Sequence, residues 1–272
     1  MKWERGDRSN IEDLRGRSGF GVAHLGIGGV LLLLVLSWLS GTNLFSLLGT
    51  VTPGESDTSA TGGRVTTSPA EERQVDFVDT VTNDVQDTWS QVLGNRYQRT
   101  RVVLFRDAIE SACGSAESAT GPFYCPSDAK VYLDLGFFNE LARRFGAPGD
   151  FAQAYVIAHE VGHHVQNLIG ATRLNTGGET SNQHSVRVEL QADCLAGVWG
   201  HTARASLEIT DADLGEALTA AHAIGDDTLG QSDERKFTHG SSEQRKRWFR
   251  RGFESGDARR CDTFAVQSNR EL

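Results

Sequence analysis

The residues AYVIAHEVGHHVQNLIG, positions 154–170, combine a strongly apolar helix pattern with three histidines and one glutamate. Asp150 is placed to cap the start of this segment and Gly170 to stop it, which predicts one long helix. Imidazole and carboxylate groups are costly to bury unless another group pairs with them. The pattern therefore indicates that these polar side chains share a chemical task inside the fold.

His159, Glu160 and His163 form the pattern H-E-x-x-H. Residues four apart on a helix lie on the same face, so the rings of His159 and His163 point toward one place. Neutral imidazole is a good ligand for zinc, and a neighbouring carboxylate can take a proton from a metal-bound water. We expect one Zn²⁺ ion held by both histidines, with Glu160 as the catalytic base. The alternative is a helix with histidines on its surface.

A catalytic zinc site needs a third protein ligand. The segment SVRVELQADCLAG, in a second predicted helix over residues 183–207, places Glu189 and Asp193 four residues apart on one face. H-E-x-x-H followed by E-x-x-x-D resembles the gluzincin arrangement of thermolysin and its membrane-bound relatives. The resemblance implies that Glu189 is the third zinc ligand and that Asp193 bonds the outer nitrogen of His159. Two alternatives stay open: a pair of surface acids, or Asp193 as the ligand with Glu189 outside the site.

A wider resemblance covers roughly residues 70–265. The segments ACGSAESATGPFYCPSDAKVYLDLGFF and FTHGSSEQRKRWFRRGF, together with the two metal motifs, resemble the bacterial putative neutral zinc metallopeptidases that are anchored by one N-terminal helix. The resemblance implies a zinc-dependent peptidase acting on peptide or protein substrates. It does not supply the substrate.

His239, in the segment FTHGSSEQR, is a second candidate catalytic residue. Zinc peptidases often use a histidine or tyrosine to hydrogen-bond the tetrahedral oxyanion, and a loop before a predicted helix could bring His239 to the metal. The alternative is a structural histidine in a turn. His164 points about 100° away from His163 around the helix, so we expect a packing or surface role for it.

Two further segments have weaker interpretations. KVYLD, residues 130–134, is a candidate strand for pairing with an extended substrate, as in other zinc peptidases. The basic run from Arg245 to Arg251 spreads over more than one side of a helix and is interpreted as a solvated face with aromatic packing. Together with the formal net charge of -9, this argues against a nucleic-acid-binding protein.

The N-terminal part of the chain predicts a membrane anchor. Residues 20–40 are almost entirely apolar and long enough to cross a bilayer as a helix. Lys and Arg precede them in the charged tail over residues 1–19 but are absent after them until Arg64, which predicts a cytoplasmic N-terminus and a domain outside the cytoplasm. A cleaved signal peptide is the alternative. The Gly-, Ser- and Thr-rich residues 41–69 are predicted to be a flexible linker.

The four cysteines fit an oxidising compartment, where disulfides persist. Cys113 and Cys125 bracket a short loop of small residues, and Cys194 and Cys261 are left over. We expect the disulfides Cys113–Cys125 and Cys194–Cys261. Four reduced, buried thiols are the alternative.

Residues 70–272 are predicted to form one zinc metallopeptidase domain of the α+β class. Helical periodicity dominates, and residues 100–105 and 130–135 are expected to form strands of a small antiparallel sheet. The main alternative function is a membrane-tethered, non-catalytic protein whose zinc only joins two helices; such a site would be closed by four protein ligands. A serine hydrolase is disfavoured because the sequence has no G-x-S-x-G.

Overall fold

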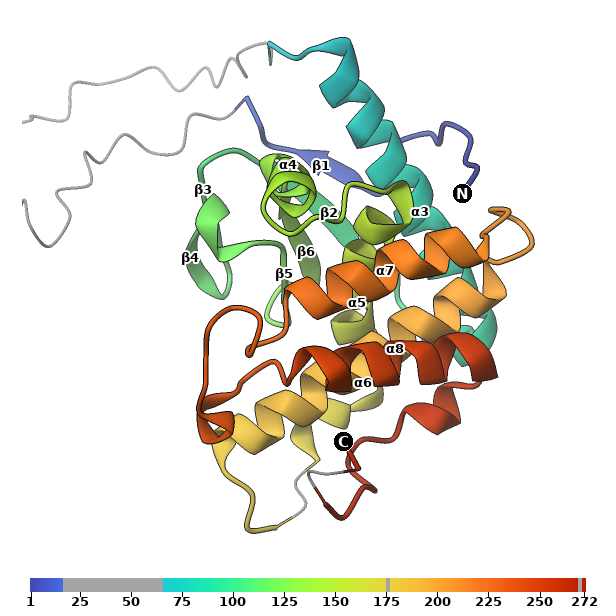
Figure 1. Ribbon diagram of the computed structural model, residues 1–272. Coiled ribbons are helices and arrows are strands. Elements are labelled where there is room, and N and C mark those ends of the chain that lie inside the picture. The colour runs from blue at the N-terminus through green and yellow to red at the C-terminus, as the bar shows by residue number, and fades with distance from the viewer. Residues whose placement is uncertain (17–65, 175–176, 269–270) are drawn as a thin grey trace, which may run out of the picture. The chain divides into compact units, whose positions relative to one another are not determined.

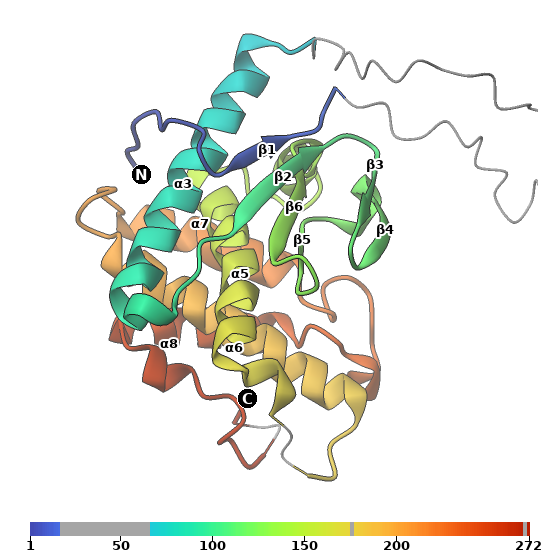
Figure 2. The same cartoon turned by 180° about the vertical axis from the view of Figure 1, so that it is seen from behind.

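Helix α5 (Asp150–Ile169) carries the H-E-x-x-H pattern and runs through the middle of the fold (Figure 1). It packs between α3 (Pro69–Leu93) and the strands on one side and α6 (Ser181–Thr202) and α7 (Asp211–Ala223) on the other, as Figure 2 shows from behind. This position explains why its apolar residues from Phe151 to Val165 are almost completely buried, while Ile169 at its end is exposed. Gly170 adopts a left-handed conformation, with φ of 74°, and ends the helix where the sequence predicts.

Two further helices complete the helical part. The short α4 (Gly136–Arg143) precedes α5, and α8 (Ser242–Ser255) packs on α6 and α7. Thr210 and Ser241 cap α7 and α8, each accepting a hydrogen bond from a backbone N–H of the first turn. Thr180 caps α6 in the same way, so this helix begins at Ser181 rather than at residue 183.

The computed structural model describes residues 1–16, 66–174, 177–268 and 271–272. Within this part of the chain, no helix combines the length and the apolar character needed to cross a membrane. The membrane helix predicted over residues 20–40 lies outside the described residues, as does most of the linker predicted over 41–69.

Four short strands form a sheet in the order β1-β2-β6-β5. The strands are β1 (Ile11–Asp13), β2 (Arg101–Phe105), β5 (Phe123–Cys125) and β6 (Lys130–Asp134). The prediction of an antiparallel sheet is wrong for most of it, because β1, β2 and β6 pair in parallel and only β5 runs antiparallel to β6. Parallel neighbours need a crossover connection, and the chain between β2 and β6 provides one. The α+β class is confirmed, with helices predominating.

A separate two-stranded hairpin, β3 (Ala108–Ser111) and β4 (Gly114–Glu117), lies within that crossover. Both expected disulfides are present. Cys113–Cys125 joins the hairpin turn to β5, and Cys194–Cys261 joins α6 to the segment that follows α8. Each disulfide therefore holds a segment against an element that borders the cavity described below.

Residues 1–15 belong to the same folded unit as residues 66–272, which corrects the prediction of a separate tail over residues 1–19. Strand β1 forms the edge of the sheet beside β2. Charge pairing explains why a segment rich in arginine packs here: the buried Arg15 side chain donates hydrogen bonds to Glu71 and Glu72 at the start of α3.

This packing restricts any membrane attachment through residues 20–40. A single crossing that left residues 1–15 on the opposite side of a membrane would remove β1 from the sheet and Arg15 from its acidic partners. The pairing of β1 with β2 therefore requires residues 1–15 and residues 66–272 to lie on the same side of any membrane.

Glycines bring the helix backbones into direct contact around α6. A Cβ atom added to Gly162 of α5 would lie 3.1 Å from the carbonyl oxygen of Ala192 in α6. A Cβ at Gly252 of α8 would overlap the carbonyl oxygen of Cys194, also in α6. The residues of α6 from Glu189 to Cys194 are therefore held closely by both neighbouring helices.

We predict that Gly252→Ala destabilises the protein, because the added methyl group has no room between α8 and α6. Overpacking of this kind costs about 1–3 kcal/mol or more. Gly215→Ala in α7 is the matched control, since nothing lies within 4 Å of an added Cβ there. The control should be stabilised by about 0.5–1 kcal/mol through higher helix propensity. Denaturant unfolding measures both changes; equal stability of the two variants would contradict the close contact.

Candidate metal centre

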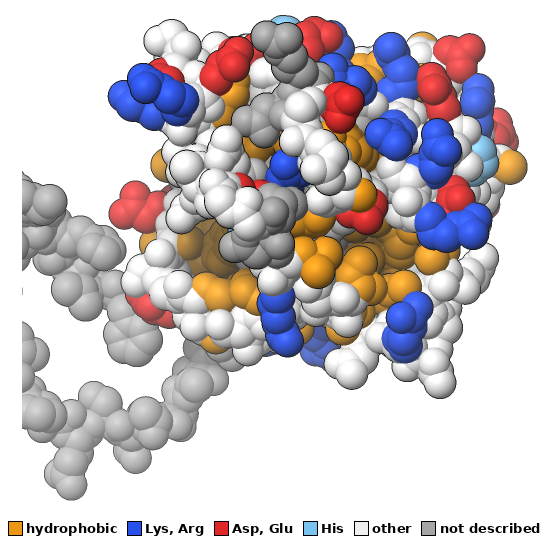
Figure 3. Space-filling view, turned by 90° about the horizontal axis from the view of Figure 1, so that it is seen from below, with side chains coloured by type: hydrophobic (Ala, Val, Ile, Leu, Met, Phe, Trp, Pro, Cys, Tyr) orange, Lys and Arg blue, Asp and Glu red, His pale blue; other side chains and the backbone are white. Residues whose placement is uncertain are grey.

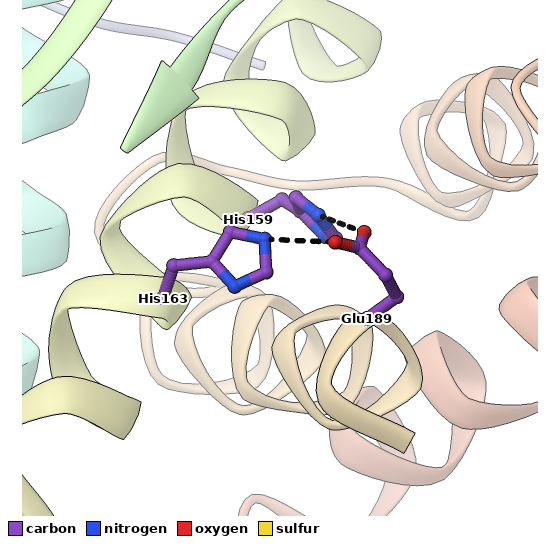
Figure 4. Close-up of side chains that lie close together, drawn as sticks. All are labelled: His159, His163 and Glu189. Atoms are coloured by element: carbon purple, nitrogen blue, oxygen red, sulfur yellow. Dashed lines mark hydrogen bonds and ion pairs between the residues drawn. The ribbon is translucent and has the colours of Figure 1, made fainter. Parts of the chain in front are cut away.

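Three side chains from two helices converge at the middle of α5 and α6 (Figure 4). His159 and His163 lie on one face of α5, with ring centroids 4.8 Å apart. Glu189 reaches them from α6: its Oε2 is 3.2 Å from His159 Nε2, and its Oε1 is 3.5 Å from His163 Nε2. The spacing of four residues and the close approach of the two helices together produce this geometry.

A second partner orients each histidine ring. His159 Nδ1 lies 2.8 Å from Oδ1 of Asp193, and His163 Nδ1 lies 2.8 Å from Oε1 of Gln166. Both partner oxygens can only accept, so each Nδ1 carries the hydrogen. Each Nε2 then turns toward Glu189, as a metal ligand requires.

The three groups fit a zinc ion. One donor atom from each of His159, His163 and Glu189 lies within 4.8 Å of the other two, and no other such group of His, Cys, Asp or Glu occurs among the described residues. Two imidazoles and one carboxylate form a donor set found in catalytic zinc sites. The fit therefore comes from the number, the type and the convergence of the donor atoms.

Without a metal ion, protons compete for the same atoms. Burial lowers the pKa of His159, but the Asp193 carboxylate and the bond to Glu189 outweigh burial and raise it to about 10. Burial raises the pKa of Glu189, but His163 and His159 outweigh it and hold that pKa well below its usual value. Because the raised pKa of His159 favours its protonated form, metal binding at this nitrogen has to displace a proton.

Glu160 follows His159 on α5 and is 8% exposed. It lines a cavity of about 720 Å³ together with His159, His163 and Glu189. The cavity also has an apolar wall, formed by Phe137, Phe145, Val156, Ile224 and Leu229. On the face seen in Figure 3, apolar side chains also gather around a hollow in the surface. The candidate base and the candidate metal ligands therefore border one space that is large enough for part of a peptide.

His239 lines the same cavity, in the turn before α8. Its Nδ1 lies 3.2 Å from Oδ1 of Asp226, so the hydrogen on Nδ1 is directed to that carboxylate. The other oxygen of Asp226 accepts backbone N–H groups from Thr238, His239 and Gly240. The turn that holds His239 is therefore built around one buried carboxylate.

The strand beside the cavity is β5, not the segment KVYLD. KVYLD forms β6, which already pairs with β2 on one side and β5 on the other. Strand β5 is the edge strand opposite to β1, and Phe123 and Tyr124 line the cavity. Residues 130–132 of β6 have a partner on both sides, so the prediction for KVYLD is wrong for this part of the strand; Leu133 and Asp134 pair with β2 but not with β5.

His164 belongs to the packing of α5. Its Nδ1 lies 3.0 Å from the Tyr124 hydroxyl, and its Nε2 lies 2.6 Å from the carbonyl oxygen of Gln98. Burial lowers the pKa of His164, so the neutral form is favoured. This confirms a packing role and excludes His164 from the metal group.

Sequence reasoning missed three residues around this centre. Gln166 and Asp226 orient His163 and His239. Arg245 was assigned to a solvated basic face, but its side chain is buried and pairs with Asp193. The spacing of Gln166 three residues after His163 was a signal, because such positions are neighbours on a helix.

The putative neutral zinc metallopeptidase family matches residues 1–264. The chain belongs to this family. The match includes residues 1–15, which agrees with their place in the folded unit.

Two relatives illustrate the extent of the similarity. The uncharacterized protein YpfJ of Escherichia coli K12 is 42% identical over 286 residues, covering 97% of this chain and 99% of that protein. The uncharacterized protein Rv2575 of Mycobacterium tuberculosis H37Rv is 42% identical over 201 residues, covering 68% of each chain. No solved structure matches.

We predict that His163→Ala abolishes retention of zinc after dialysis, because it removes one of three ligands. The loss of affinity should exceed the roughly 10–100-fold caused by removing an outer partner. His164→Ala is the matched control and should retain one equivalent of zinc, although it loses buried hydrogen bonds. Atomic absorption on both purified variants measures the metal. Stoichiometric zinc in His163→Ala would contradict the assignment.

Proposed function

We propose that the chain is a zinc-dependent peptidase in which His159, His163 and Glu189 hold the metal. The observation that carries this proposal is that the three ligands and Glu160 border one cavity. Zinc bound there would act as a Lewis acid and lower the pKa of a water at the open coordination position to about 7.

The other groups have roles that follow from their positions. Glu160 accepts the proton of the attacking water on its carboxylate and passes it to the leaving nitrogen. The contact of His239 Nδ1 with Asp226 orients the ring, so that Nε2, when it carries a hydrogen, donates a hydrogen bond to the oxyanion. Asp193 and Gln166 keep the two histidine ligands in the required orientation.

Substrate recognition is proposed to use β5 and the apolar wall. An edge strand can pair with an extended peptide through backbone hydrogen bonds, and apolar side chains can receive one side chain of that peptide. This assigns to β5 the pairing role first considered for β6.

The alternative is a non-catalytic protein with a structural zinc. Such a site would be closed by four protein ligands. The metal group in the described part of the chain has three members, and all four cysteines are in disulfides. These observations favour the catalytic proposal.

We also propose that the protein works in an oxidising compartment, because two disulfides would not persist in a reducing one. Membrane attachment through residues 20–40 stays a prediction, with the restriction that residues 1–15 and the rest of the fold lie on one side. The absence of nucleic-acid binding also stays a prediction.

We predict that Glu160→Gln keeps zinc but lowers peptide turnover by about 10²–10⁴-fold, because the amide cannot accept a proton. Glu140→Gln is the matched control, since Glu140 lines the same cavity but is absent from the metal group. Both variants are tested on an unstructured protein substrate, with cleavage followed by mass spectrometry and zinc by atomic absorption. Wild-type turnover in zinc-loaded Glu160→Gln would overturn the mechanism.

We predict that His239→Ala lowers kcat by about 10²–10³-fold, as expected for loss of one oxyanion donor, with little change in zinc content. His222→Ala, an exposed histidine in α7, controls for loss of an imidazole elsewhere. Steady-state kinetics on a fluorogenic peptide separates kcat from KM. An unchanged kcat in His239→Ala would show that His239 has only a structural role in the turn.

A further inference from the structure

Arg245 of α8 lies directly behind the proposed zinc ligands. Its side chain is 2% exposed and faces Asp193 of α6. Arg245 Nε donates to Oδ2 of Asp193 at 2.9 Å, and Nη2 donates to Oδ1 at 3.0 Å. Two parallel bonds of this kind fix the orientation of a carboxylate as well as its position.

The Asp193 carboxylate also accepts from α5. The Tyr155 hydroxyl donates to Oδ1 at 2.6 Å, and His159 Nδ1 lies 2.8 Å from the same oxygen. Four donor atoms therefore surround one fully buried carboxylate. The hydrogen bond from His159 Nδ1 to this carboxylate fixes the orientation of the ring. A residue that orients Asp193 therefore also orients the metal ligand His159.

The guanidinium of Arg245 joins the surrounding helices. Its Nη1 donates to the carbonyl oxygen of Ile224 at the end of α7, at 3.2 Å. Its Nη2 lies 3.3 Å from the Tyr155 hydroxyl and 4.0 Å from Oε2 of Glu189. A planar group with several N–H donors can make these contacts at once, whereas the single ammonium of a lysine cannot.

Charge gives Arg245 a second effect on the site. Three carboxylates belong to the site: Glu160 and Glu189 line the cavity, and Asp193 lies behind His159 on its Nδ1 side. With neutral histidines, their negative charge exceeds that of a divalent cation by one. Arg245 supplies the remaining positive charge within a region that water hardly reaches, where an uncompensated charge is costly.

We propose that Arg245 is a positioning residue of the zinc site, which holds Asp193 so that Asp193 orients His159 toward the metal. The backbone contact between Gly252 and Cys194 keeps α8 close enough to α6 for the guanidinium to reach Asp193. The inference rests on the zinc site of the proposed function but not on peptide hydrolysis.

The test compares Arg245→Lys and Arg245→Met with Arg250→Met, a change at an exposed position of the same helix. Zinc affinity is measured by competition with a chromophoric chelator, and ligand geometry by the visible absorption of the cobalt-substituted protein. Both Arg245 variants should bind zinc at least tenfold more weakly and show altered cobalt bands, with Arg250→Met like the wild type. Wild-type affinity and bands in a folded Arg245 variant would overturn the proposal.

A double-mutant cycle keeps the proposal testable if Arg245→Met does not fold. Arg245→Lys and Asp193→Asn are combined, and zinc affinity is measured for the single and double variants. If Arg245 acts through Asp193, the double variant should lose little more affinity than Asp193→Asn alone. Additive losses would show that Arg245 acts independently of Asp193 and would overturn the proposal.

The readouts also separate this inference from the proposed function. If the Arg245 variants show altered cobalt bands and the wild-type protein does not cleave peptides, the positioning role of Arg245 is upheld and the peptidase function is rejected. A merely structural Arg245 would change the unfolding midpoint and leave the cobalt spectrum of the folded protein unchanged.

Discussion

The contact between α5 and α6 is the constraint on which the site depends. Gly162 lies between the two histidine positions, and its lack of a side chain lets the Ala192 backbone approach. Glu189 and Asp193 stand on either side of Ala192, so the same contact brings one acid to Nε2 and the other to Nδ1 of His159. A wider spacing between the helices would separate both acids from the ring. A glycine that costs about 1 kcal/mol of helix propensity is therefore used where close approach matters most.

The histidine pair, Glu160 and the acids of α6 could be predicted from the sequence because each set is local. Spacing of four on a helix determines which side chains share a face, whatever the rest of the fold does. Pairing of the two sets required the resemblance to known zinc peptidases, since nothing in α6 itself points to α5. The structure brings them together as that resemblance implies.

The residues that sequence reasoning missed depend on contacts between distant segments. Arg245 stands in a run of basic residues, and only the packing of α8 against α6 separates it from its exposed neighbours. In the sequence, Asp226 does not differ from other acidic residues in loops. Only the structure shows that its carboxylate accepts backbone N–H groups of the turn that holds His239. The sheet was misjudged for the same reason. Strand patterns indicate which residues are extended but not which strands pair. Strand β1 was missed because the many charged residues around it favour an unpaired N-terminal tail.

The place of β1 has a consequence for the integrity of the chain. Residues 1–15 are joined to the remainder by backbone pairing with β2 and by the arginine pairs with α3, independently of the covalent path between them. If a protease cut that path anywhere between residues 16 and 66, the two pieces would remain associated as a nicked protein. They would migrate together in native gel filtration and separate only under denaturing electrophoresis. One cut would leave the intervening residues attached to one of the two associated pieces. Two cuts, one on each side of those residues, would separate them from the domain while residues 1–15 stay in place through β1 and the arginine pairs.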